Sequence, residues 1–68
     1  MIDLVMLNEK MRDSGMTITA IAEKSNISRE TLYNKMNGTR DFRASEIMNL
    51  SKTLRLTTAE RDRIFFAE

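Results

Sequence analysis

The chain has 68 residues and contains neither cysteine nor histidine, which excludes disulfides, thiolate zinc sites and imidazole chemistry. A chain of this length lies near the lower limit for independent folding, so we expect residues 1–68 to form a single domain. The net charge is only +1, no apolar run approaches the roughly 20 residues that cross a bilayer, and no signal sequence is recognisable, which together predict a cytoplasmic protein without membrane contact.

The first two predicted helices cover residues 2–13 and the stretch that follows Thr17. Apolar residues recur there at three- and four-residue spacing, and proline is absent, which is typical of an all-α chain. Gly15 suits the left-handed position just beyond the first helix, and Thr17 is suited to cap the second. The inner face of the second helix carries Ile18, Ile21 and Ala22.

A third helix is predicted from the cap Ser28 to the stop signal Asn37-Gly38, and it meets the second helix at a sharp corner. Ala22 is small enough for the two helices to approach closely, and Asn26 tolerates the left-handed backbone of a tight turn. Ile27 fills the corner, and Leu32 lies on the inner side of the third helix. A small residue at the helix crossing, a left-handed turn and two apolar residues in the corner are the features that a helix-turn-helix requires.

The remainder of the chain predicts a basic loop and two further helices. Residues 39–43 form the loop, with Phe42 as its apolar anchor. A fourth helix covers residues 44–54, and the pair Thr57 and Glu60 has the spacing of a capping box that opens a fifth. Five helices joined by short connections predict a compact bundle.

The stretch TITAIAEKSNISRETLYNKMNG, residues 17–38, resembles the helix-turn-helix of the phage Cro and repressor superfamily, also called XRE-type regulators. LSKTLRLT, residues 50–57, and ERDRIFFA, residues 60–67, extend the resemblance over nearly the whole chain, toward a short single-domain phage subgroup. The resemblance implies a five-helix bundle of the lambda-repressor-like type. It also implies that the third helix enters the major groove of double-stranded DNA.

The same resemblance implies which residues contact an operator. The positions that contact bases, or flank those that do, carry Arg29, Glu30, Tyr33 and Asn34. Arginine can bind guanine and asparagine can bind adenine in bidentate geometry, and glutamate can accept from cytosine. The residues expected to contact the DNA backbone are Thr17, Ser28, Lys35, Asn37, Thr39, Arg40 and Arg43.

Three departures from the family pattern affect this expectation. Ile18 stands where many relatives have a phosphate-contacting glutamine, and Asn26 stands where the turn is often glycine. Lys35 stands where relatives often have an apolar core residue. If Met36 takes over that packing role, the third helix is rolled, and Lys35 becomes free to reach a phosphate.

Two features bear on partners. Residues 26–55 hold six lysines and arginines against three carboxylates, and carboxylates are in slight excess on both sides of this segment. The terminal Ile64, Phe65 and Phe66 are candidates for an interface, because adjacent phenylalanines on a helix point about 100° apart and both cannot face the same interior.

The sequence therefore predicts a sequence-specific regulator of transcription that acts as a homodimer, at least on operator DNA. The alternative is an antirepressor or antitoxin-like module that binds another phage regulator through the same fold; low net charge, Ile18 and the terminal aromatic pair favour it. An enzyme is not expected, because the chain shows no glycine-rich phosphate loop and no metal constellation. No cofactor, metal or small-molecule substrate is expected either.

Overall fold

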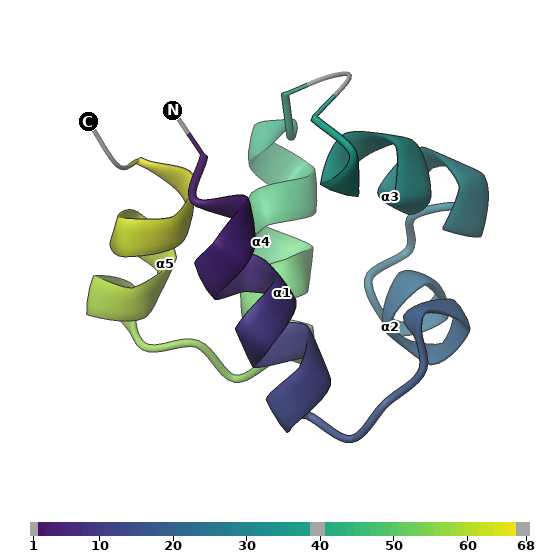
Figure 1. Cartoon of the computed structure of the whole chain (residues 1–68), viewed down its shortest axis with the longest axis horizontal. Coiled ribbons are helices and arrows are strands. Elements are labelled where there is room, and N and C mark those ends of the chain that lie inside the picture. The colour runs from purple at the N-terminus through teal and green to yellow at the C-terminus, as the bar shows by residue number, and fades with distance from the viewer. Residues whose placement is uncertain (1, 39–40, 67–68) are drawn as a thin grey trace.

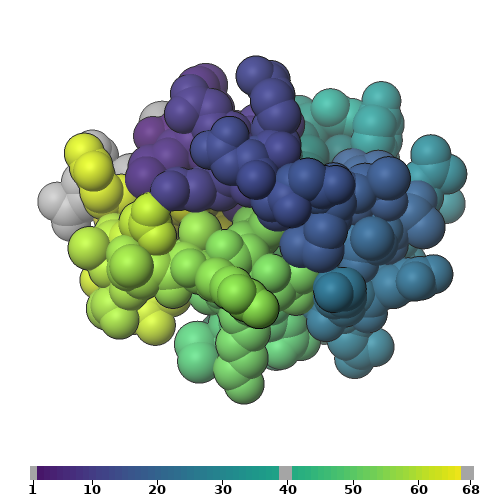
Figure 2. All heavy atoms as spheres, turned by 90° about the horizontal axis from the view of Figure 1, so that it is seen from below, coloured from purple at the N-terminus to yellow at the C-terminus, as the bar shows by residue number. Residues whose placement is uncertain are grey.

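The computed structural model describes residues 2–38 and 41–66, and within them the chain forms five helices and no strand. The helices are α1 (Leu4–Asp13), α2 (Ile18–Lys24), α3 (Arg29–Met36), α4 (Ala44–Thr53) and α5 (Thr58–Phe65). Figure 1 shows α2 and α3 at one end of the molecule and α5 at the other. The turned view in Figure 2 also has the blue side chains of α2 and the yellow end of α5 at opposite ends.

The fourth helix links the two ends, because α4 contacts both α2 and α5. The first helix packs against α5, and the N–H of Asp3 donates to the carbonyl of Ile64 at 2.7 Å. The prediction of an all-α bundle is confirmed. None of the helices within the described ranges has the length and apolar character of a membrane span.

Local capping interactions start the helices where the sequence predicts them. The side chains of Thr17, Ser28 and Thr57 each accept the backbone N–H three residues further on. The capping box is reciprocal, because the N–H of Thr57 also donates to the carboxylate of Glu60 at 2.9 Å. The first helix begins two residues later than predicted, because the carboxylate of Asp3 caps it.

The second helix ends in the left-handed turn that the sequence predicts. Asn26 has φ 55°, and the N–H of Ile27 donates to the carbonyl of Ala22 at 3.0 Å. This hydrogen bond satisfies a carbonyl in the last turn of α2. The fourth helix ends in the same way at Arg55, with φ 53°, which was not predicted. An arginine is an unusual residue there, since its Cβ crowds the backbone in this conformation.

The core receives side chains from all five helices and from the segment between α3 and α4. Phe42 is buried, as predicted for the anchor of the loop, and its ring meets that of Phe65 edge-on at 5.5 Å. The buried apolar residues are Leu7, Met11, Ile21, Ala22, Ile27, Leu32, Phe42, Ile47, Leu50, Ile64 and Phe65.

The prediction of an interface at the end of α5 is wrong for two of its three residues. Ile64 is fully buried and Phe65 is 5% exposed, so both belong to the core. Phe66 is 58% exposed. The expected divergence of adjacent phenylalanines is therefore confirmed, and Phe66 is the one that faces outward.

Polar contacts hold the end of α2 against α4. The hydroxyl of Ser25 is fully buried and donates to Oγ1 of Thr53 at 2.9 Å. The side-chain amide of Asn49 donates to the carbonyl of Ser25 at 3.1 Å. These contacts satisfy polar groups that would be costly to bury alone. They also join the corner between α2 and α3 to the rest of the bundle.

An ion pair joins α1 to α5. The ammonium of Lys10 lies 2.5 Å from the carboxylate of Glu60. This hydrogen bond, together with the one from the N–H of Thr57, lowers the pKa of Glu60 from 4.5 to about 2. The same contact raises the pKa of Lys10.

We expect Glu60 to make the free energy of unfolding depend on pH in the acidic range. Because its folded-state pKa is lowered, its contribution is fully present above about pH 4.5 and is lost as the pH falls toward about 2. Denaturant unfolding followed by circular dichroism should therefore show a smaller loss of stability in that interval for Glu60→Gln than for the wild type. Glu23→Gln is the control, because Glu23 is exposed and forms no ion pair with any described residue. Equal losses for the wild type and Glu60→Gln would contradict this role.

Candidate nucleic-acid interface

The corner between α2 and α3 is packed as the sequence predicts. Ala22 is 1% exposed where the helices approach, and Ile27 is 7% exposed in the turn. Leu32 is fully buried on the inner side of α3. The corner therefore holds α3 by its apolar side and leaves the other side of this helix to solvent.

The exposed side of α3 carries the residues predicted to read bases. Arg29 and Glu30 lie in its first turn, and Tyr33 and Asn34 follow one turn later; all four are exposed. Asn37, just beyond the last turn, is exposed as well. The structure thus brings the predicted base-reading residues together on one surface.

The third helix is not rolled in the way that the sequence suggested. Lys35 is 6% exposed and occupies the core side together with Leu32, whereas Met36 is only partly buried against the core. Lys35 thus occupies the position at which the resemblance to the Cro and repressor superfamily led us to expect an apolar residue. The exposed face that carries Asn34 is consequently preserved.

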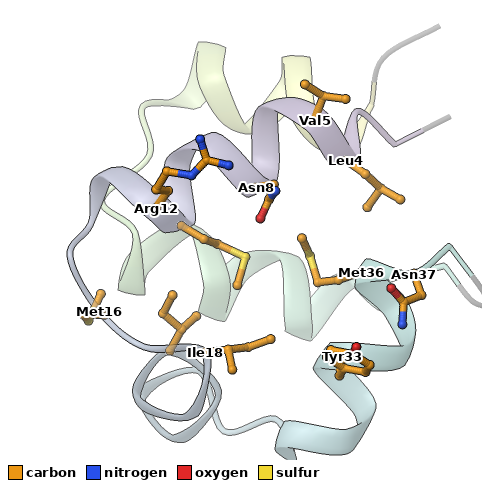
Figure 3. Close-up of a pocket in the computed structure, with 11 residues that line it drawn as sticks. Leu4, Val5, Asn8, Arg12, Met16, Ile18, Tyr33, Met36 and Asn37 are labelled. Carbon is orange, nitrogen blue, oxygen red and sulfur yellow. The ribbon is translucent and has the colours of Figure 1, made fainter.

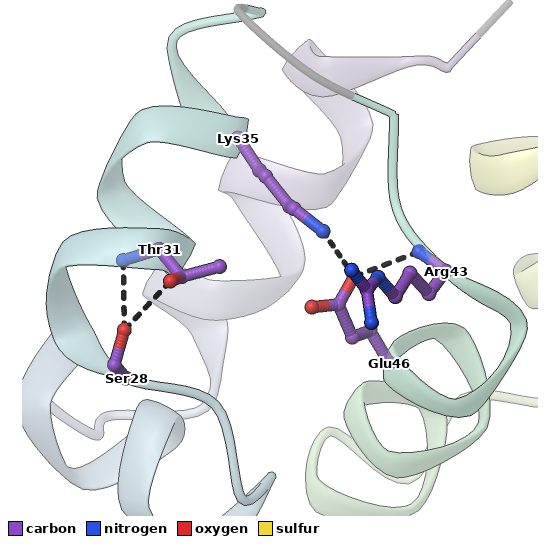
Figure 4. Close-up of polar contacts among 5 residues, drawn as sticks. All are labelled: Ser28, Thr31, Lys35, Arg43 and Glu46. Atoms are coloured by element: carbon purple, nitrogen blue, oxygen red, sulfur yellow. Dashed lines mark hydrogen bonds and ion pairs between the residues drawn. The ribbon is translucent and has the colours of Figure 1, made fainter.

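The prediction that Lys35 contacts the DNA backbone is wrong. Figure 4 shows its ammonium donating to the carboxylate of Glu46 on α4 rather than pointing to solvent. The same carboxylate oxygen accepts the N–H of Arg43 at 2.7 Å. Burial would raise the pKa of Glu46, but these two donors outweigh it and lower the pKa. The ammonium of Lys35 is therefore paired inside the protein and is not available to a phosphate, since a buried charge needs a partner.

Two of the predicted backbone contacts, Thr17 and Arg43, lie at the starts of neighbouring helices. Thr17 is exposed at the start of α2 and caps it by accepting the N–H of Ala20 at 3.1 Å. Arg43 is exposed at the start of α4. The predictions for Thr39 and Arg40 fall outside the described residues.

Ser28 has local partners in the protein. Its hydroxyl accepts the N–H of Thr31 at 3.0 Å and donates to Oγ1 of the same residue at 2.7 Å, as drawn in Figure 4. Ser28 is exposed, so a phosphate can still reach it if the hydroxyl turns away from Thr31. Its cap role is confirmed, and its contact with DNA stays a prediction.

A groove of about 500 Å³ adjoins this surface, between α1 and the pair formed by α2 and α3. Figure 3 shows Leu4 and Asn8 reaching it from α1, Ile18 from α2, and Tyr33 and Met36 from α3. The tyrosine is 58% exposed, so its ring both lines the groove and faces solvent. Ile18 belongs to the wall of this groove and packs partly against the core.

Sequence reasoning missed the partners that fix two of the site residues. Thr31 satisfies the hydroxyl of Ser28, and Glu46 satisfies the ammonium of Lys35. A signal for the second was present, because a lysine at an apolar position requires a counter-ion. The sequence offers several carboxylates as counter-ions for Lys35, and only the tertiary structure, which brings α4 beside the end of α3, selects Glu46.

A family comparison agrees with this geometry. The model described as the helix-turn-helix domain of resolvase matches residues 9–39. The chain contains a helix-turn-helix. The match extends over less than half of the chain and concerns this motif, and it does not distinguish the Cro and repressor type. No curated protein and no solved structure gave a significant match.

Proposed function

We propose that the chain is a sequence-specific regulator of transcription of the Cro and repressor type, which places α3 in the major groove of an operator. The observation that carries the proposal is the exposed face of α3, on which Arg29, Glu30 and Asn34 stand together while Leu32 anchors the opposite side. In a helix-turn-helix the N-terminal residues of the second helix meet base edges. Occupation of a phage operator would then exclude polymerase.

Each exposed residue of α3 has a suitable partner among the bases. The guanidinium of Arg29 donates to O6 and N7 of guanine, and the amide of Asn34 pairs with N6 and N7 of adenine. Glu30 accepts from N4 of cytosine and is repelled by phosphate in a wrong register. Tyr33 packs on a thymine methyl group or donates its hydroxyl to a phosphate.

In this proposal, residues before and after α3 in the sequence contact the DNA backbone. The oxygen of Thr17 caps α2, and we propose that its hydroxyl proton is donated to a phosphate. Asn37 and Arg43 add contacts from the end of α3 and the start of α4. Thr39 and Arg40, which fall outside the described residues, are proposed as backbone contacts from the sequence alone. Ser28 adds a contact at the start of α3.

Binding to operator DNA across a salt series tests this function. We expect a specific complex with the DNA flanking the gene, with an affinity that falls as salt rises, because cations on the protein release counterions from phosphates. Random duplex DNA of equal length should bind at least about a thousandfold more weakly. Affinity that is flat with salt and equal for both duplexes would refute the regulator.

We propose further that the regulator acts as a dimer on two half-sites about 10 bp apart, with Phe66 in the interface. This residue is exposed at the end of α5, while its neighbour Phe65 fills the core. Sedimentation equilibrium on operator DNA and without it should show weaker dimers for Phe66→Ser. Val5→Ser, which removes another exposed apolar side chain, is the control. Dimers of equal strength in both variants would place the interface elsewhere.

A second candidate is an antirepressor or antitoxin-like module that binds another regulator. The groove between α1, α2 and α3 favours it, because apolar residues such as Leu4, Met16 and Ile18 line it next to the reading face. Size-exclusion chromatography with and without the regulator encoded beside it distinguishes the two functions. Tight operator binding without a new protein complex would exclude this second candidate.

A further inference from the structure

One carboxylate joins α3, α4 and the segment between them. Glu46 lies on α4, accepts the ammonium of Lys35 from α3, and accepts the N–H of Arg43 from the segment between these helices. The ammonium also lies 5.8 Å from the centre of the Phe42 ring, within the range of a cation–π contact. Phe42 in turn rests on Phe65 of α5.

This pair is a costly way to fill the core. The side chains of Lys35 and Glu46 are only 7% and 14% exposed. Apolar residues of similar size would fill such a site at least as well, because two buried charges lose their hydration. The pair differs from apolar packing in being directional: its hydrogen bonds hold only when the last turn of α3 stands in one orientation to the first turn of α4.

We propose that Lys35 and Glu46 are a positioning pair, which sets the orientation of α3 against α4 and against the segment that contains Arg43. The consequence for recognition rests on the proposed function, in which α3 reads bases and Arg43 contacts a phosphate. The pair gives these two sets of contacts a fixed spacing, so that both engage the same DNA only in the correct register. Neither residue touches DNA in this role.

The decisive variant is Lys35→Met combined with Glu46→Gln. The side-chain oxygen of glutamine can still accept the N–H of Arg43, so the start of α4 keeps its cap, and methionine replaces the lysine stem. We expect a melting temperature close to that of the wild type. Residual dipolar couplings of the backbone N–H groups, recorded without DNA, should show α3 rotated relative to α4.

The same variant should lose operator binding selectively. We expect its affinity for the operator to fall about tenfold, equivalent to the loss of one good base contact, while its affinity for random duplex DNA stays unchanged. Lys35→Arg retains a cation for Glu46 and should preserve both the couplings and the discrimination. A merely structural pair would instead lower the melting temperature and weaken both duplexes alike.

Unchanged couplings and unchanged discrimination in the double variant would overturn the proposal. If that variant does not fold, Lys35→Met alone decides, because it removes the buried ammonium while the carboxylate of Glu46 keeps the N–H of Arg43; a smaller effect in the same direction on both measurements is expected, and none would refute the pair. A wild-type chain that binds no DNA would refute the regulator instead, and the couplings would still test the orientation of α3.

Discussion

Leu32→Ala is expected to destabilise the fold by about 2–5 kcal/mol, the largest effect of any substitution considered. Leu32 is fully buried where α3 meets the corner with α2. The truncated side chain loses its transfer free energy and leaves a cavity that rigid neighbours fill only in part. A chain of 68 residues has a total stability of about 3–10 kcal/mol. The variant should therefore lose a large fraction of the total stability.

Denaturant unfolding followed by far-ultraviolet circular dichroism measures this loss. Val5→Ala is the matched control, because Val5 is another aliphatic residue in a helix but is 71% exposed. Its truncation should change the stability by less than about 0.5 kcal/mol. Equal midpoints for Leu32→Ala and the wild type would show that α3 is not anchored through this residue.

Arg29→Ala is expected to reduce operator affinity by about 1–3 kcal/mol, which is roughly fivefold to more than a hundredfold. Arg29 is exposed at the first position of α3, so its removal should leave the core and the melting temperature almost unchanged. The guanidinium offers a planar pair of donors that matches one edge of guanine. Its loss should relax the preference at one base pair of each half-site.

A panel of operators, each with one base pair changed, measures this relaxation. Arg63→Ala is the control, since Arg63 is an exposed arginine on α5, at the other end of the molecule from α3. It removes the same charge and should leave the pattern of base preferences intact. A uniform loss on every operator for Arg29→Ala would assign this residue to the DNA backbone instead of a base.

Much of the fold was predictable, because it depends on interactions between residues close in sequence. The caps at Thr17, Ser28 and Thr57 each satisfy an N–H three residues away, and the left-handed turn at Asn26 follows from its short polar side chain. The inward position of Leu32 follows from helical periodicity. The grouping of exposed polar residues on α3 was predictable for the same reason.

The features that the sequence did not predict depend on contacts between residues distant in sequence. The periodicity showed that Phe65 and Phe66 point apart, but only the packing of α5 against Phe42 decided that Phe65 is the buried one. The left-handed backbone at Arg55, with φ 53°, was likewise not predictable from the residue type, because arginine disfavours this conformation.

Lys35 shows most clearly which features the sequence predicts and which depend on tertiary contacts. The sequence by itself determined that a lysine stands at an expected apolar position of the third helix, and its charge left two outcomes, a phosphate in DNA or a counter-ion in the protein. The tertiary structure decided between them, because α4 brings the carboxylate of Glu46 to the buried ammonium. A buried charge is stable only beside its partner, and chain folding alone brings two residues eleven positions apart into contact.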